Sequence, residues 1–184
     1  MYTKNSLSIL SFDLGNNLGI AFSKFNRQTQ ILNVIDTKLI SIDSIKKDNS
    51  MEFDFCSNKC INTIVFDKII STLIMNYSPI DIYVVEDAFI HFIRAYSSLL
   101  LYLNKLEEVI AMRFKKRLFK ISPTVIKQHM TQSGAADKIR MMQSIYLKND
   151  IKLKKRMLNS LSEHETDAVA VAYAFVKQFS LLYI

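Results

Sequence analysis

Apolar and polar residues follow two different patterns along this chain, and the first pattern predicts strands. Residues 7–13 and 18–24 are apolar runs joined by Gly15-Asn16-Asn17, whose residues suit a hairpin turn. A third, less regular apolar run covers residues 31–40. The start of the chain therefore predicts three consecutive antiparallel strands.

The second pattern begins after residue 60, where helical spacing alternates with short apolar runs. Apolar residues three and four positions apart predict a helix over 62–77, ended by Pro79, and a longer helix over 95–117. Short apolar runs at 82–86 and 118–122 predict two further strands. A strand, helix and strand that follow a hairpin indicate a mixed sheet with helices on both faces.

The remaining segments are more polar. Residues 41–60 are polar and irregular, and residues 46–50 are the best loop candidate. Pro123 begins a helical segment, and a polar break at 133–136 precedes a helix over 137–146. The last helix is predicted from about Glu163 through Val176. The chain is therefore expected to have an α/β fold.

Size and composition fit one globular domain. With 184 residues, 49% of them hydrophobic and 22% charged, we expect a single domain over residues 1–184. The sequence shows no apolar stretch of bilayer-spanning length and no signal-peptide pattern, so we expect a soluble, intracellular protein without membrane association. Cys56 and Cys60 are interpreted as reduced thiols, because no second Cys/His pair at ligand spacing accompanies them.

The charge is unevenly distributed and indicates a polyanionic partner. Lys and Arg number 24 against 17 Asp and Glu, which gives a net charge of +7. Basic residues cluster at 115–120 and at 148–156. Such clusters suit nucleic acid better than a membrane surface, because no amphipathic anchor accompanies them. A merely solvated basic surface is the alternative.

Four side chains that can bind metal ions occupy the ends of predicted elements. Asp13 and Glu86 each end an apolar run, so each is expected at the edge of a buried strand. His164 and Asp167 are one helical turn apart at the start of the last helix. Oxygen and nitrogen ligands from two strands and a helix can form a site for hard divalent cations, which phosphodiester cleavage requires.

Each of these residues also has a simpler structural explanation. Asp13 could form the turn, and Asp-x-Gly also begins the phosphate loop of actin-like ATPases. Glu86 could be a plain strand-end acid; of Glu86 and Asp87 only one can face the site, because neighbouring strand residues point to opposite faces. Asp167 could serve the helix dipole. Lys127 and Lys138 could neutralise a phosphate near the carboxylates or be solvated.

Taken in order, these motifs resemble the RuvC family of Holliday junction resolvases, within the RNase H-like superfamily, over about residues 8–177. Phe-Asp-Leu-Gly-Asn-Asn-Leu-Gly-Ile-Ala and Val-Val-Glu-Asp-Ala-Phe are similar to the first two family motifs. Pro-Thr-Val-Ile-Lys-Gln and Ser-Gly-Ala-Ala-Asp-Lys are similar to its lysine segment and turn. His-Glu-Thr-Asp-Ala-Val-Ala-Val-Ala is similar to its last motif, although many members have Asp at the position of His164. Viral, phage and organellar hosts all fit.

The resemblance implies an RNase H-like fold, with a five-stranded mixed sheet flanked by helices, and a homodimer. It also implies a structure-selective DNA endonuclease that resolves four-way junctions by paired, symmetric incisions. Two Mg²⁺ ions, or Mn²⁺ in their place, would be held by Asp13, Glu86, His164 and Asp167, with Lys127 as a further catalytic residue. DNA would be contacted by Phe89 at the junction centre and by Lys127 and Lys138.

Three other functions compete with this hypothesis. The first is another RNase H-like nuclease that acts on hybrid or branched nucleic acid, and the second is a non-catalytic junction-binding protein. The third, an actin-like nucleotide-binding protein, would need two such domains and about twice the length.

The predicted helix over 95–117 is the expected dimer seam, with Leu99, Leu103 and Leu106 as candidates. Burial in the core of one subunit is the alternative for these leucines.

Overall fold

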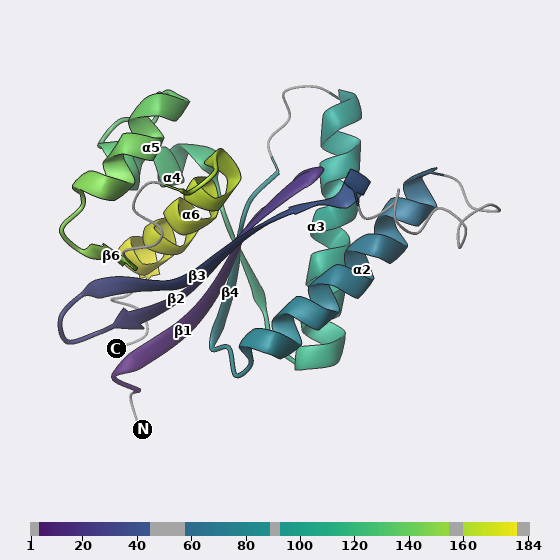
Figure 1. The fold of residues 1–184 in the computed structure, drawn as a ribbon, viewed down its shortest axis with the longest axis horizontal. Coiled ribbons are helices and arrows are strands. Elements are labelled where there is room, and N and C mark those ends of the chain that lie inside the picture. The colour runs from purple at the N-terminus through teal and green to yellow at the C-terminus, as the bar shows by residue number, and fades with distance from the viewer. Residues whose placement is uncertain (1–3, 45–57, 89–92, 155–159, 180–184) are drawn as a thin grey trace.

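The sheet is mixed and has helices packed on both of its faces. The computed structural model describes residues 4–44, 58–88, 93–154 and 160–179. Its sheet has six strands in the order β5-β4-β1-β2-β3-β6 (Figure 1). The predicted α/β class with a mixed sheet is confirmed, whereas the expected count of five strands is one too low.

The first three strands form the predicted antiparallel meander. β1 (Ser6–Asp13) pairs along its whole length with β2 (Asn17–Asn26), and β2 pairs with β3 (Ile31–Ser41). On one side of the sheet these strands bury the larger apolar residues Leu10, Phe12, Leu18 and Ile20. The opposite side carries Ile9 and Ala21. Both sides are apolar because both are covered by helices.

Two more strands run parallel to β1. β4 (Ile82–Glu86) lies beside β1, and β5 (Leu118–Ile121) lies beside β4. Because these strands run in one direction, their carboxyl ends meet at the same edge of the sheet. Asp13 and Glu86 are the last residues of β1 and β4 and therefore lie at this edge.

The sixth strand is the one that the sequence did not predict. β6 (Ile151–Leu153) has only three residues and pairs in parallel with the first half of β3. Its two apolar residues lie between lysines, in the segment interpreted as a basic cluster. Such a short strand has no periodicity of its own and forms because the edge of β3 is available to it.

Helices cover both faces of the sheet in two layers (Figure 1). Among the described helices, the layer on one face is α2 (Asn58–Tyr77) and α3 (Ile93–Phe114). The layer on the other face is α4 (Pro123–Thr131), α5 (Lys138–Leu147) and α6 (Glu163–Phe179). Each layer has its own apolar core against the sheet.

The predicted helix and loop boundaries need two corrections. The expectation that residues 41–60 are irregular is wrong at both ends of this segment, because residues 42–44 are helical and α2 already begins at Asn58. The loop candidate 46–50 and Cys56 lie outside the described residues. α3 stops at Phe114 rather than at residue 117, since Lys115 takes a left-handed conformation with φ of 53° and leaves the helix.

The proposed dimer seam needs a larger correction. Leu103 and Leu106 are 3% and 0% exposed and pack in the core between α2, α3 and the sheet. Both are therefore buried in the core of one subunit, which was the alternative to a dimer seam. Leu99 is half-buried and lines a cavity beside Asp13 and Glu86. None of the three leucines is therefore an exposed seam residue. In the part of the chain that the structure describes, no helix is long and apolar enough to span a bilayer.

Candidate active site

The candidate site lies where the carboxyl ends of the parallel strands meet the first turn of α6. Residues 9–12 of β1 pair with residues 82–85 of β4, so Asp13 and Glu86 are the next residues on adjacent strands. Ile9 and Val84 face α6, and the alternation of strand residues places Asp13 and Glu86 on that same face. The sequence argument that favoured Glu86 over Asp87 is thus supported, although the exposed Asp87 also borders the cavity there.

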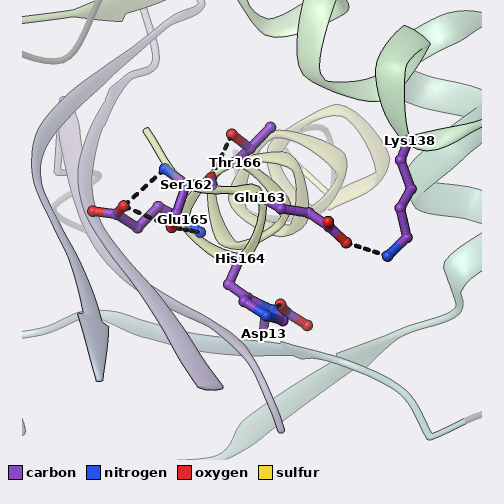
Figure 2. Close-up of polar contacts among 7 residues, drawn as sticks. All are labelled: Asp13, Lys138, Ser162, Glu163, His164, Glu165 and Thr166. Atoms are coloured by element: carbon purple, nitrogen blue, oxygen red, sulfur yellow. Dashed lines mark hydrogen bonds and ion pairs between the residues drawn. The ribbon is translucent and has the colours of Figure 1, made fainter. Parts of the chain in front are cut away.

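His164 comes to this edge from the opposite end of the chain. Its Nδ1 lies 2.7 Å from Oδ2 of Asp13, across 151 residues of sequence. Figure 2 shows the imidazole directly over the carboxylate, while the neighbouring Glu163 points away from it. The side chains of Asp13 and His164 are 16% and 33% exposed, so water and a small ligand can still reach the pair.

The first turn of α6 is held in place by a capping box. The hydroxyl of Ser162 accepts a hydrogen bond from the amide of Glu165, and the Glu165 carboxylate accepts hydrogen bonds from the amide and hydroxyl of Ser162. Thr166 adds a hydrogen bond from its hydroxyl to the Ser162 carbonyl (Figure 2). These reciprocal bonds satisfy amides that a helix leaves unpaired at its start. His164 therefore projects from a well-anchored turn.

Burial and neighbouring negative charges disfavour the ionisation of three carboxyl groups at the site. Burial, together with the charges of Asp13 and Asp167, raises the pKa of Glu86 to about 7, with Lys127 opposing the change. Burial and the charges of Asp13 and Glu163 raise the pKa of Asp167 to about 6. Burial also raises the pKa of Asp13, although its hydrogen bond to His164 opposes the rise. A bound cation would relieve this repulsion.

Two hollows open on either side of Glu86 and Lys127. One has a volume of about 310 Å³ and includes Asp13 in its wall, and the other has about 360 Å³ and includes Asp167 and Lys138. Glu86, Lys127 and Pro123 line both of them. The carboxylates from β1, β4 and α6 thus line two adjoining hollows that share part of their walls.

The donor set suits a hard divalent cation, but the side chains do not yet meet at one point. Carboxylate oxygens and an imidazole nitrogen are appropriate ligands for Mg²⁺ or Mn²⁺. Among the described residues, however, no three His, Cys, Asp or Glu side chains are grouped so that they could hold an ion as they stand. Asp13 and His164 direct one donor atom each at the other. Coordination would therefore require small side-chain rotations and the loss of this hydrogen bond.

Positive charge at the site comes from two lysines and three helix starts. Lys127 projects from α4 into both hollows. Lys138 forms an ion pair with Glu163, so its ammonium group is held at the start of α6 (Figure 2). α4 begins at Pro123 in the wall of the hollows, and the first residues of α5 and α6 are the two members of the ion pair. Helix N-termini carry partial positive charge and favour anions such as phosphates.

The structure thus brings most of the predicted residues to one edge of the sheet, and it adds one that was not singled out. The residues that come together are Asp13, Glu86, Lys127, Lys138, His164 and Asp167. Phe89, the predicted residue at the junction centre, lies outside the described residues. The addition is Gly19, which pairs with Asp13 across β1 and β2 and lies against the backbone of His164.

Comparison with known proteins supports the fold. No family model and no curated protein matches this chain. Among solved structures, Thermus thermophilus RuvC in complex with Holliday junction substrate is 13% identical with a TM-score of 0.73, covering 96% of this chain and 97% of that one. The yeast mitochondrial Holliday junction resolvase Ydc2 is 12% identical with a TM-score of 0.69, covering 98% of this chain and 80% of its own.

A viral structure extends this set. The fowlpox virus Holliday junction resolvase is 12% identical with a TM-score of 0.57, covering 94% of this chain and 99% of that one. At identities this low the likeness establishes the fold, which confirms the predicted RNase H-like class. It extends over nearly the whole chain, from β1 through α6.

Proposed function

We propose that the protein is a metal-dependent DNA endonuclease that resolves four-way junctions by paired incisions. One observation carries the proposal. Asp13, Glu86 and Asp167, drawn from β1, β4 and α6, line two adjoining hollows, and His164 lies against Asp13, in a fold shared with three junction resolvases. The charge of Asp13 raises the pKa of both Glu86 and Asp167, so these carboxylates are close enough to interact, and a shared cation would stabilise their ionised forms.

These four side chains would hold Mg²⁺, with Mn²⁺ able to replace it. When bound, such ions supply an activated water nucleophile and stabilisation of the leaving oxygen, the chemistry of two-metal phosphodiester hydrolysis. Asp13 would contribute a carboxylate from one hollow and Asp167 from the other, and Glu86 lines both. His164 would turn its ring from Asp13 toward the shared space.

The basic residues at the site would bind and orient the DNA backbone. Lys127 lies in both hollows, close enough to Glu86 to oppose its rise in pKa, and would neutralise charge on the scissile phosphate. Lys138 is 80% exposed and already paired with Glu163, so it would exchange that partner for a phosphate when DNA binds. Phosphate contacts of this kind give affinity and orientation rather than sequence preference.

Two symmetric incisions require two sites related by a two-fold axis, and we therefore propose a homodimer. Because Leu103 and Leu106 are buried in the core, a dimer seam on α3 would have to lie on the side of this helix that faces away from the core. Leu101 and Met112 are 41% and 66% exposed and lie three helical turns apart on one face. Lys105 and Glu108 form an ion pair on the stretch between them. This face can be tested by sedimentation of the Met112→Glu variant.

The decisive experiment compares a labelled four-way junction, a linear duplex of the same sequence and an RNA–DNA hybrid. Each is incubated with Mg²⁺, Mn²⁺ or EDTA. We expect paired nicks in the junction that require a divalent cation, and much slower cutting of the other two substrates. Preferential cutting of the hybrid would replace the proposal with a different RNase H-like nuclease.

A second candidate, a non-catalytic junction-binding protein, is favoured by one observation. The described side chains include no preassembled group of three metal ligands. On this reading the protein would bind the junction tightly and leave it uncut with every cation. The same experiment, followed by native gel electrophoresis of the mixtures, separates binding from cutting.

A further inference from the structure

Gly19 lies in the interior of β2, where a glycine needs an explanation. It is buried and is the residue directly opposite Asp13 in the antiparallel pair of β1 and β2. Glycine weakens a strand interior, because it loses more conformational freedom on folding and has no side chain to pack. No glycine of the described chain has a positive φ, so the backbone conformation does not require one here.

The space around Gly19 supplies the reason. A Cβ atom on this residue would lie 2.0 Å from the carbonyl oxygen of His164, 2.4 Å from its carbonyl carbon and 2.9 Å from its Cβ. Real Cβ atoms essentially never approach another heavy atom within 3.0 Å. The two nearest atoms belong to the backbone of α6, which cannot rotate away as the end of a flexible side chain can. Any side chain at position 19 would therefore push strand and helix apart.

The contact between Gly19 and the backbone of His164 lies directly beside the hydrogen bond between Asp13 and His164. Asp13 is fixed to Gly19 by strand pairing, and His164 contacts Gly19 through its backbone. The 2.7 Å distance from His164 Nδ1 to Asp13 Oδ2 thus depends on how closely the first turn of α6 approaches β2. A separation of about 1 Å would lengthen this distance beyond hydrogen-bonding range, and displacements of that size are known to cost enzymes about a hundredfold in rate.

We propose that Gly19 is a positioning residue whose missing side chain lets the first turn of α6 place His164 against Asp13. The inference rests on the proposed function for its catalytic consequence, but its geometric part stands without it. Gly19 touches no substrate and acts only through His164. Its capacity to do so comes from the backbone contact, so no other amino acid can replace it.

The test follows the imidazole of His164 directly by NMR of protein with ¹⁵N-labelled histidine. The chain has three histidines, and a His164→Gln variant assigns the signal. Wild type and Asp13→Ala define the ring nitrogen shifts with and without the carboxylate partner. We expect Gly19→Ala to move the His164 signal most of the way to the Asp13→Ala position. Its junction cleavage rate should fall ten- to a hundredfold with little change in the apparent KM.

The matched control is Ser23→Thr, which adds one methyl group to β2 at another fully buried position on the face that carries Gly19 and Ala21. It should lower stability comparably and leave both the His164 signal and the cleavage rate near wild type. All variants are compared in a stabilising osmolyte, so that a loss of stability alone does not unfold them.

Three outcomes overturn the inference. The first is an unchanged His164 signal in Gly19→Ala, and the second is full cleavage activity despite a shifted signal. The third is a Gly19→Ala protein that stays unfolded in osmolyte while Ser23→Thr folds, since Gly19 would then serve the fold in general. If wild type cuts no junction at all, the proposed function fails, while the histidine signals still decide whether Gly19 positions His164.

Discussion

The two ends of the sheet carry opposite kinds of chemistry. At the carboxyl end of β1, β4 and β5, carboxylates gather beside the first turns of α4, α5 and α6. At the other end, basic residues gather where α3, α5 and α6 finish and β4 and β5 begin. Lys115, Lys116 and Arg117 follow α3, Lys148 follows α5, and Lys177 lies in the last turn of α6.

Two of the basic residues at this second end, Lys148 and Lys177, bind other parts of the protein. The ammonium group of Lys148 donates a hydrogen bond to the carbonyl of His129, near the end of α4. Lys177 forms an ion pair of 2.5 Å with Asp150. Cations near helix C-termini stabilise unpaired carbonyls and the helix dipole. A net charge of +7 is therefore a poor guide to where a phosphate binds.

Comparison of the two ends shows that the position of a basic residue matters more for phosphate binding than the number of basic residues. Lys120, a member of the first basic cluster, is also neutralised by Glu107 at 2.6 Å. Near the carboxylates the described cations are few: Lys138 begins α5 and is paired with Glu163, and Lys127 lies in the second turn of α4 and lines both hollows. A polyanion partner at the cluster 148–156 remains a prediction, and Lys155 and Arg156 lie outside the described residues. For residues 115–117, the position at the far end of β5 from Glu86 favours the alternative, a solvated basic surface.

The largest effect is expected from the carboxylate end. Asp13→Asn keeps the size of the side chain but removes a charged ligand, and it should lower the cleavage rate by a factor of roughly 10³ or more. Junction affinity should change little, because phosphate contacts dominate it. The two quantities are measured by single-turnover cleavage and by gel shift in Ca²⁺. Substantial nicking by Asp13→Asn at normal Mg²⁺ would remove Asp13 from the metal site.

A smaller effect is expected from the lysine at this same end. Lys127→Gln should reduce the single-turnover rate by roughly 10- to 100-fold, because the lysine opposes the negative charge beside the scissile phosphate. Lys120→Gln is the matched control, since Lys120 pairs with Glu107 and lines neither hollow at the site. Equal rates for the two variants would show that Lys127 is only a solvated surface group.

The carboxylates should also make stability depend on pH and on cations. The folded-state pKa of Glu86 is raised from an ordinary 4.5 to about 7, and that of Asp167 from 3.8 to about 6. Between pH 4.5 and 7 the folded protein therefore binds protons that the unfolded chain has lost, so the free energy of unfolding falls as pH rises.

In EDTA we expect the thermal midpoint to fall by roughly 5 °C across this window. Added Mg²⁺ should remove most of the fall, because a cation stabilises the ionised carboxylates. Differential scanning fluorimetry of wild type and the Glu86→Gln, Asp167→Asn double variant measures both effects. A double variant with the same pH dependence as wild type would assign the effect to other groups.

The smallest effect is expected from the opposite end of the sheet. Replacing Lys115, Lys116 and Arg117 together by Gln should leave the cleavage rate within about twofold of wild type, because these residues lie at the far end of β5 from Glu86. The slope of log affinity against log salt should also change by less than one unit, the value expected for about one lost phosphate contact. A slope that flattens by two or more units would show that junction arms reach this end.

The sequence predicted the elements that have strong periodicity and the residues that end them. Asp13 and Glu86 could be placed because an apolar run that stops at a carboxylate implies a strand edge. β6 could not be predicted, because a strand of three residues is too short to show a periodicity. Leu103 and Leu106 were ambiguous because periodicity shows that a helix face is apolar but not what covers it.

The details of the site depended on tertiary contacts, with one exception. The ion pair of Lys138 with Glu163 requires α5 and α6 to begin side by side, and the role of Gly19 requires the approach of α6 to β2. Neither relation is written in the local sequence. The capping box is the exception, since Ser162 and Glu165 have the spacing of that motif and could have been recognised beforehand.

The pair of Asp13 and His164 also determines when during synthesis the site can exist. The two residues are 151 positions apart, and α6 packs on β1 and β2, which a ribosome makes first. A nascent chain with β1 through α5 complete still lacks two of the four proposed ligands. Any cutting activity would therefore begin only after α6 has been translated and docked, so that an unfinished chain cannot damage nucleic acid near the ribosome.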